Sequence, residues 1–273
     1  RMKVLLTGGS GFVGINIAEA ILEAGGDAVV YSRRPMPEQA AGELSGLPGK
    51  LDWVRGDVLD REKLLEVLRG ERIDAVVHAA AITPDVHRES EQMSQIVRVN
   101  ILGTFNLLEA AREAGVGRFV YISSVAVYGS ATLGAHEGSP TLPENNYGAS
   151  KLAAEKVVLE WAASSPDNRA LIVRPAVVIG PWHRANMLRL ISQVDRGIYF
   201  FNIGSGAHIK SVAAVQNLAL FASASVAEGF SDKSVDYYNY VDYPQLTVRR
   251  TLEVIHEELG RKMAAFVKEE KHA

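Results

Sequence analysis

The stretch 2–32, MKVLLTGGSGFVGINIAEAILEAGGDAVVYS, decides the fold of this chain. Its first apolar run, Lys3–Thr7, does not alternate with polar residues, which is typical of a parallel strand buried on both faces. Apolar residues then recur from Val13 to Ile21 with the period of an amphipathic helix. With Asp27–Tyr31 as the next apolar run, the stretch predicts a strand, a glycine-rich turn, a helix and a second strand.

The turn in this stretch carries Gly8, Gly11 and Gly14 at the spacing G-x-x-G-x-x-G. Glycines remove side chains where a pyrophosphate must approach the backbone, and the start of the helix offers free N–H groups and a positive dipole end. The alternative is a tight turn that needs glycine for steric reasons only. The strand before the turn and the helix after it favour dinucleotide binding.

Composition limits the class of protein. The chain has 273 residues, 47% of them hydrophobic, and a net charge of −3, so we expect no nucleic acid or membrane partner. No apolar run approaches the length of a membrane span. The sequence has no cysteine, which excludes disulfides, thiolate catalysis and cysteine metal sites. We expect a cytoplasmic protein without a bound metal.

Apolar strands alternate with helical stretches through the first 175 residues, which predicts an α/β fold with a doubly wound parallel sheet. We expect residues 2–176 to form a dinucleotide-binding Rossmann domain and residues 177–273 a smaller substrate-binding lobe, from which the chain can cross back. The predicted strands after the first two are 51–55, 73–80, 118–123, 170–174 and 236–240, and the later helices are 60–69, 89–113, 147–163, 187–194, 212–226 and 247–259.

Two groups of polar residues could carry chemistry. Tyr147 and Lys151 are four residues apart and would share one face of a helix, where an ammonium would lower the pKa of the phenol. Ser123 and Ser124 end a buried strand, where a hydroxyl can bond a substrate oxygen. The alternatives are an exposed helix pair and serines that bond the loop backbone.

Six motifs occur in one order: TGGSGFVG at 7–14, HAAA at 78–81, VNILGT at 99–104, YISSVAVYG at 121–129, YGASK at 147–151 and RPAVVIGP at 174–181. In this the chain resembles an extended short-chain dehydrogenase/reductase of the NAD(P)-dependent epimerase/dehydratase family. The resemblance implies an enzyme that transfers hydride at a secondary alcohol or ketone of a sugar or sugar-like substrate.

The resemblance also implies residue roles. Tyr147 would be the general acid/base, and Lys151 would lower its pKa and hold the nicotinamide ribose. Ser124 would bond the reacting substrate oxygen, with Ser123 as its neighbour. Asn100 resembles the family asparagine that supports a proton path near the lysine.

Further positions are implied to hold the cofactor or to lie near the substrate. The cofactor-binding residues would be Gly8, Gly11, Phe12, Val13, Gly14, Ser32, Arg33, Arg34, Asp57, Val58, Ala79, Ala80, Ala81, Tyr147, Lys151, Pro175, Val177 and Val178. His183 could face the substrate or be a solvated loop residue. For His78, a structural role is favoured over a catalytic one, because nothing in the nearby sequence would tune its pKa.

The end of the second strand departs from NAD-preferring relatives, in which an acidic residue bonds the ribose diol. This chain has Ser32 there, followed by Arg33 and Arg34. The missing carboxylate removes repulsion of a 2′-phosphate, and guanidinium groups bind phosphate well. We therefore predict NADP rather than NAD, although the arginines could merely solvate a loop.

Two other departures concern the substrate. Val177 stands where many nucleotide-sugar enzymes of the family have an asparagine, and Lys210 stands where an arginine often contacts the diphosphate. Both argue against a UDP- or dTDP-sugar. The alternatives are an NADP-dependent ketone or aldehyde reductase of a small non-sugar substrate and, in a different class, a non-catalytic NADP-binding sensor or scaffold.

The helix predicted at 147–163 is apolar over a wide arc, with a narrow polar strip at Glu155, Lys156 and Glu160. A helix that is apolar on nearly two sides needs two partners. One partner would be the sheet. The second would be another subunit, since related enzymes often dimerise through this helix and the one at 89–113, so we expect a homodimer.

Overall fold

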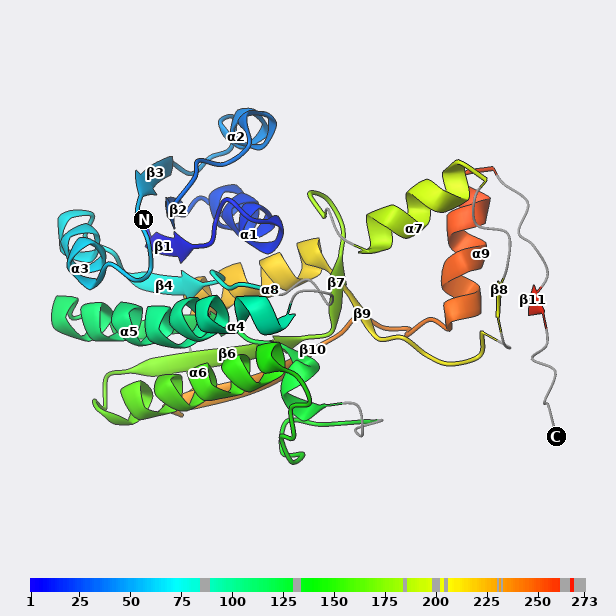
Figure 1. Cartoon of the computed structure of the whole chain (residues 1–273). Coiled ribbons are helices and arrows are strands. Elements are labelled where there is room, and N and C mark those ends of the chain that lie inside the picture. Colours follow the sequence, from blue (N-terminus) through cyan, green and yellow to red (C-terminus); the bar gives the residue numbers. More distant parts are fainter. Residues whose placement is uncertain are drawn as a thin grey trace.

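A computed structural model describes residues 1–83, 89–129, 134–183, 186–197, 202–203, 206–229, 231, 233–260 and 266–267. Its centre is a seven-stranded sheet of order β10-β6-β5-β4-β1-β2-β3, in which every neighbouring pair is parallel (Figure 1). The strands are β1 (Lys3–Thr7), β2 (Asp27–Ser32), β3 (Leu51–Arg55), β4 (Ala75–His78), β5 (Arg118–Ile122), β6 (Arg169–Pro175) and β10 (Val235–Tyr240). The predicted doubly wound Rossmann sheet is confirmed.

Helices cover both faces of the sheet. One face packs against α1 (Phe12–Glu23), α2 (Glu38–Leu44) and α8 (Val215–Glu228), and the other against α3 (Arg61–Gly70), α5 (Gly103–Ala114) and α6 (Asn146–Ala163). Successive residues of a strand enter opposite cores, because side chains alternate across the sheet. In β1, Val4 and Leu6 join the first core and Leu5 the second. This explains why the central strands β1 and β4 are largely apolar and show no alternation with polar residues.

The segment after β6 does not stay in one lobe. Helix α8 packs on α1, and β10 pairs with β6 at the edge of the sheet, so the chain crosses back. The other elements extend to one side of the sheet (Figure 1). They are β7 (Val177–Ile179), which pairs with β9 (Val212–Ala214), then α7 (Asn186–Asp195), α9 (Val248–Glu258), β8 (Asn202–Ile203) and β11 (Phe266–Val267).

The single helix predicted at 89–113 is wrong in detail. The structure has α4 (Glu89–Ile96), a π-helical turn at Val97–Leu102, and then α5. A π-helical turn inserts an extra residue per turn and often marks a functional site. Here it contains the buried Asn100, whose side chain bonds the loop that follows β4. The interruption is therefore associated with a polar contact that helical periodicity does not reveal.

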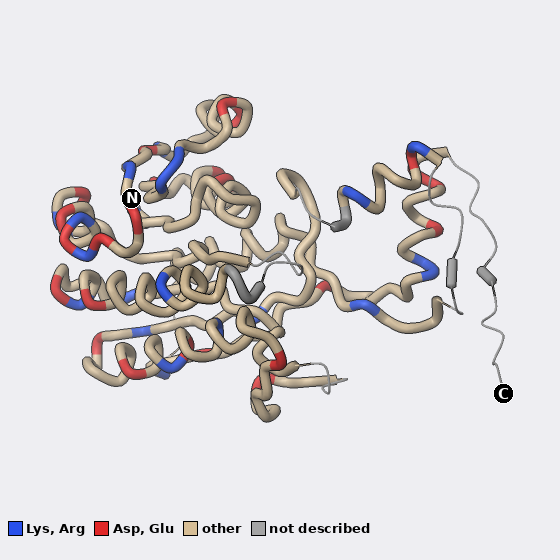
Figure 2. The backbone as a smooth tube through the Cα atoms, in the orientation of Figure 1, with Lys and Arg blue, Asp and Glu red and all other residues tan. Residues whose placement is uncertain are grey.

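Charged residues of both signs are interspersed along the outer helices (Figure 2). An example is α5, where Arg112 pairs with Glu109. Of the helices in the described ranges, none is both long enough and apolar enough to span a bilayer.

Candidate active site

The glycine-rich turn packs directly against the end of β4. A Cβ atom added at Gly8 would lie 2.6 Å from the backbone nitrogen of Ala80, and one at Gly14 would lie 2.2 Å from the carbonyl oxygen of Gly8. No side chain caps α1 at Gly11. The first turn of α1 therefore directs N–H groups and its positive dipole end at the turn, as an anion site requires.

Beside this turn lies a cavity of about 390 Å³ at the carboxyl ends of β2, β3 and β4. Of the predicted cofactor residues, it is lined by Gly8, Gly11, Ser32, Arg33, Arg34, Asp57, Val58, Ala79, Ala80 and Ala81. The chain reverses its strand order between β1 and β4, which is where open α/β sheets bind nucleotides. A glycine cradle, an uncapped helix start and two guanidinium groups fit a dinucleotide with phosphate groups.

The remaining predicted cofactor residues do not line this cavity. Gly14 lies behind the turn, and the Phe12 ring packs against the ring of His183 with centroids 4.8 Å apart. Burial lowers the pKa of His183. The contact brings His183 to the start of α1. Val13 belongs to the core around α1, and Pro175, Val177 and Val178 lie on β6 and β7.

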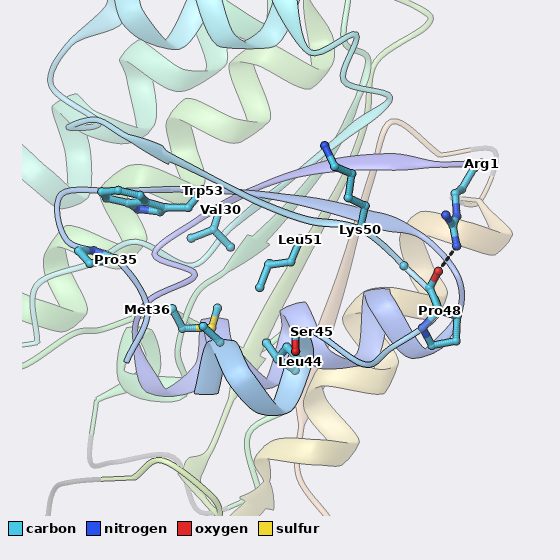
Figure 3. A pocket seen from close by; sticks show the side chains of 12 residues that line it. Arg1, Val30, Pro35, Met36, Leu44, Ser45, Pro48, Lys50, Leu51 and Trp53 are labelled. Carbon is cyan, nitrogen blue, oxygen red and sulfur yellow. Dashed lines mark hydrogen bonds between the residues drawn. The ribbon is translucent and has the colours of Figure 1, made fainter. Parts of the chain in front are cut away.

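Ser32 is held by a residue that the sequence did not single out. The indole Nε1 of Trp53 donates to Ser32 Oγ at 3.0 Å, and Ser32 Oγ donates to the carbonyl oxygen of Arg34 at 2.7 Å. Trp53 also borders a second cavity, of about 600 Å³, between α2 and the strands β2 and β3. Figure 3 shows its indole beside Val30 and Pro35 at one end of that apolar cavity.

Tyr147, Lys151 and Ser124 meet at the carboxyl end of β5. The Lys151 ammonium donates to the carbonyl oxygen of Ile122 at 2.8 Å and lies 5.9 Å from the centre of the Tyr147 ring. Burial lowers the pKa of Lys151 to about 7, and the charge of Glu155 opposes that shift. The lysine is therefore close to its own titration point at neutral pH.

The expectation that Lys151 lowers the pKa of Tyr147 is wrong for the chain by itself. Burial raises the pKa of Tyr147, and side-chain hydrogen bonds with Thr83 and Ser124 offset part of this. Burial is thus the dominant influence on this phenol, because it disfavours the charged phenolate. The phenol is protonated at neutral pH, so the chain presents an acid there.

Ser123 and Ser124 diverge. Ser124 caps the short helical turn at Val125–Tyr128 by accepting from the N–H of Ala126 at 3.1 Å. Ser123 is 2% exposed and donates to Glu155 Oε1 at 2.5 Å. The predicted place of Ser123 beside the substrate is corrected, because its hydroxyl points into the protein.

The sequence placed Glu155 in a narrow polar strip with Lys156 and Glu160, but in the structure Glu155 is buried while the other two are exposed. Its carboxylate is buried and receives Arg174 Nη2 at 2.6 Å and Arg174 Nε at 2.9 Å. Burial alone would lower the pKa of Arg174, but the hydrogen bonds and charge of Glu155 raise it. Arg174 is a charged residue within the largely apolar strand β6. A buried arginine needs a hydrogen-bonded acidic partner, so the sequence did contain a signal for such a residue.

Asn100 connects three segments. Its Oδ1 accepts from the N–H of Ile82 at 2.7 Å, and its Nδ2 donates to the carbonyl of Ile82 at 3.0 Å and to Ser150 Oγ at 3.0 Å. Ser150 Oγ in turn donates to the carbonyl of Tyr147 at 2.8 Å. Asn100 therefore fixes the loop after β4 against the first turn of α6. Among the described residues, the side chain of Asn100 forms hydrogen bonds with Ile82 and Ser150, and none with Lys151.

His78 is buried between two threonines. Its Nδ1 lies 2.6 Å from Thr7 Oγ1 and its Nε2 lies 2.9 Å from Thr104 Oγ1. Because Thr104 donates its proton to the carbonyl of Asn100, it accepts from Nε2–H, and Nδ1 accepts from Thr7. Burial, followed by the charge of Lys151, lowers the pKa of His78 to about 3. This neutral ring supports the structural role favoured from the sequence.

A third cavity, of about 700 Å³, lies past the end of β5 and between β6, β10 and the loops that follow them. Its walls include Val125, next to Ser124, and Ala176, next to Pro175. Tyr128, Asn239, Tyr243 and Gln245 supply aromatic and uncharged polar groups. Thr83, Tyr128 and Asn239 belong to the site and were not identified from the sequence.

The sequence profile of the NAD dependent epimerase/dehydratase family matches residues 4–236. A curated relative, N-acetyl-alpha-D-glucosaminyl-diphospho-ditrans,octacis-undecaprenol 4-epimerase of Escherichia coli O157:H7, is 34% identical over 269 residues, 97% of this chain and 74% of that protein. UDP-glucose 4-epimerase of Streptomyces lividans is 37% identical over 164 residues, 59% of this chain and 48% of that protein. The alignment thus spans about half of the latter relative.

Solved structures agree with the sequence comparisons. MoeE5 in complex with UDP-glucose and NAD superposes with a TM-score of 0.79 at 31% identity, covering 97% of this chain and 85% of that one. DesIV, a dTDP-glucose 4,6-dehydratase from Streptomyces venezuelae with NAD bound, gives a TM-score of 0.79 at 26% identity, covering 99% and 85%.

Proposed function

Because this chain belongs to the NAD dependent epimerase/dehydratase family, we propose that it transfers hydride reversibly at a secondary alcohol or ketone of a sugar linked to a diphosphate. Family membership makes the chain an enzyme of the epimerase/dehydratase type. The relative aligned over 97% of this chain is named for a lipid-linked glycosyl diphosphate, and others are named for nucleotide sugars. Val177 and Lys210 argued against UDP- and dTDP-sugars, and a glycosyl diphosphate carried by a lipid instead of a nucleoside is compatible with both residues.

The observation that carries the proposal is the convergence of Ser124, Tyr147 and Lys151 at one edge of the sheet. Tyr147, protonated at neutral pH, gives its hydroxyl proton to the substrate oxygen in the reducing direction and receives it in the oxidising direction. Ser124 bonds the same oxygen as its charge changes. Lys151 supplies the positive charge that stabilises a phenolate. A bound nicotinamide would supply or accept the hydride.

For the substrate, we propose the cavity of about 700 Å³ beside Ser124. Its aromatic rings and uncharged polar groups suit a polyhydroxylated ring, which presents apolar C–H faces and many hydrogen-bonding groups. The alternative of a reductase for a small non-sugar ketone or aldehyde rests on Val177, which is 43% exposed and offers no side-chain hydrogen bond.

The function is tested by incubating the enzyme with UDP-glucose, UDP-N-acetylglucosamine, dTDP-glucose and an undecaprenyl-diphosphate sugar. Products are read by chromatography and mass spectrometry while nicotinamide absorbance is followed. An epimerase yields an isomer of equal mass with no net change in absorbance, whereas a simple reductase oxidises NADPH in proportion to product. Conversion of small ketones but of none of these sugars would overturn the proposal.

For the cofactor, we propose that NADP binds more tightly than NAD. Ser32, Arg33 and Arg34 line the cavity at the end of β2, where guanidinium groups can bind a 2′-phosphate. The structures of the relatives named above hold NAD, so this preference would set the chain apart from them. Titration of both oxidised cofactors tests it, and tighter binding of NAD contradicts it.

We also propose a homodimer formed through the helices at 89–114 and α6. Met93, Val97, Leu102 and Phe105 are exposed along the first of these, from 44% to 51%. A row of large apolar side chains at that exposure favours burial against a second copy. A monomeric mass by light scattering at micromolar concentration would contradict the dimer.

A further inference from the structure

The side chain of Glu155 is a buried carboxylate near the carboxyl end of β5, where Ser124, Tyr147 and Lys151 meet. Glu155 is 1% exposed, and within the described ranges its side chain bonds Ser123 at the end of β5 and Arg174 on β6. Its Oε1 accepts from both Ser123 Oγ and Arg174 Nε, and its Oε2 accepts from Arg174 Nη2 at 2.6 Å. A bidentate guanidinium fixes the plane of a carboxylate as well as its position.

Arg174 is itself held from the other side. Its Nη1 donates to Tyr128 OH at 2.6 Å, and Tyr128 OH donates to Asn239 Oδ1 at 2.8 Å. The guanidinium carbon lies 5.0 Å from the centre of the Tyr128 ring and 4.8 Å from that of Tyr237. The position of the Glu155 carboxylate is therefore set by a network that runs from β5 to β10.

The same carboxylate lies on the face of α6 that carries Lys151, four residues earlier. The titratable groups around Lys151 are Tyr121 from β5, His78 from β4, and Tyr147 and Glu155 from α6. Of these, Glu155 is the carboxylic acid, and it forms an ion pair with Arg174 at 2.6 Å. Arg174 is a second cation beside Glu155, so the Glu155 carboxylate lies near two buried cationic side chains, Lys151 and Arg174.

We propose that Glu155 is a positioning residue: held by Arg174, it orients the Ser123 hydroxyl and supplies the negative charge that keeps the Lys151 ammonium protonated beside Tyr147. The inference rests on the proposed roles of Tyr147 and Lys151. Burial disfavours the charged lysine, and an uncharged amine would no longer stabilise a phenolate. Without Glu155, the described cluster would hold two buried cations and no anion.

The competing account is that Glu155 and Arg174 merely join α6 to β6. Buried ion pairs are weak evidence for stability, because a well-packed apolar pair of similar volume is often equally stable. A structural role predicts that replacing the whole pair leaves Lys151 unchanged. The proposal predicts that Lys151 loses its proton more readily whenever the Glu155 charge is removed.

The experiment is a pH titration of Lys151 by NMR in protein labelled with carbon-13 at the lysine side chains, with Lys151→Arg to assign the signal. In the unsubstituted protein we expect a midpoint near the value of about 7 that burial imposes. Glu155→Gln should lower the midpoint by about one pH unit. Glu160→Gln, which removes the same charge from an exposed position on the same helix, should leave it unchanged.

Because Glu155→Gln leaves Arg174 buried without its partner, the double substitution Glu155→Leu with Arg174→Met is the second variant. It should fold, and its Lys151 midpoint should also fall. A midpoint that matches the unsubstituted protein in either folded variant overturns the proposal, as does a Lys151 midpoint near that of an exposed lysine. The titration needs no substrate, so a failure of the proposed reaction is seen separately, in turnover.

Discussion

The two halves of the site use different parts of the chain. At the ends of β1, β2 and β4, the turn at Gly8–Gly14 offers backbone N–H groups and close packing of main-chain atoms. At the ends of β5 and β6, the edge is built from buried ionisable side chains, of which Lys151, Glu155 and Arg174 are each at most 4% exposed. The first half can bind a phosphate through its backbone N–H groups. The function of the second half depends on the protonation states of its ionisable side chains.

Because the two halves are built differently, substitutions in them should impair different properties of the enzyme. Substitution at the backbone half should change binding and packing. Substitution at the ionisable half should change rate and pH dependence while the cofactor still binds. The variants below are ordered from the largest expected effect to the smallest.

Tyr147→Phe removes the proposed acid/base without changing the volume of the ring. We expect turnover of the sugar identified in the substrate panel to fall about 100- to 10,000-fold, because that is the usual contribution of a positioned acid or base. NADPH affinity should change less than about threefold, below ~0.7 kcal/mol. Tyr238→Phe, at an exposed position of β10, is the matched control. A phenylalanine variant with the unsubstituted rate would remove Tyr147 from the chemistry.

Gly14→Ala tests the backbone half. The added Cβ would lie 2.2 Å from the oxygen of Gly8 and 2.6 Å from the Cα of Gly9, so the turn must move. We expect NADPH to bind about 100-fold more weakly, ~2.7 kcal/mol, and the melting temperature to fall. Gly70→Ala is the control, because a Cβ there meets no atom within 4 Å. Unchanged binding by the Gly14 variant would mean that close packing at this turn is not needed.

His78 lies on β4, between the two halves, and its burial predicts how the stability of the folded protein depends on pH. Its folded pKa of about 3 lies below the ordinary value of 6.5, so the unfolded chain binds a proton first as the pH falls. The stability present above pH 6.5 is therefore lost progressively down to about pH 3. At pH 5 the loss should be about 2 kcal/mol, from 1.36 kcal/mol per pKa unit.

Urea unfolding at pH 7 and pH 5 measures this loss. His78→Gln should lose less stability than the unsubstituted protein over that interval, by about 2 kcal/mol. His136→Gln, at an exposed position, should keep the unsubstituted pH dependence. Equal losses for the His78 variant and the unsubstituted protein would show that this imidazole does not exclude a proton in the folded state.

The sequence predicted the backbone half better than the ionisable half. Lys3–Thr7, the glycine spacing and the helix start are local features, and the structure agrees with them. Asp60 at the start of α3 is a further local feature, and its carboxylate accepts from the N–H of Lys63 at 3.0 Å. Ser123 and Glu155 are 32 residues apart, and helical periodicity could only group Glu155 with the polar residues Lys156 and Glu160. The pKa of Tyr147 was also missed, because desolvation depends on packing by segments distant in sequence.

Trp53→Phe gives the smallest expected effect and asks whether the backbone half depends on a side chain at all. The indole N–H donates to Ser32, and Ser32 donates to the carbonyl of Arg34, so a side-chain donor on β3 helps to fix the loop that carries the guanidinium groups. Phenylalanine keeps the apolar cover over the cavity in Figure 3 and removes that donor. One lost hydrogen bond of about 0.7 kcal/mol should weaken NADP binding roughly threefold and leave NAD binding unchanged.

The control is Trp161→Phe, because the buried Nε1 of Trp161 meets no acceptor within the described part of the chain. That variant can lose stability but should keep the ratio of NADP to NAD affinity. If Trp53→Phe weakens the binding of NADP and of NAD equally, the loop contacts both cofactors in the same way and Trp53 has no part in recognising the 2′-phosphate. If it weakens NADP alone, then even the half of the site built from backbone takes its specificity from a side chain, and that side chain lies on the outermost strand of the sheet.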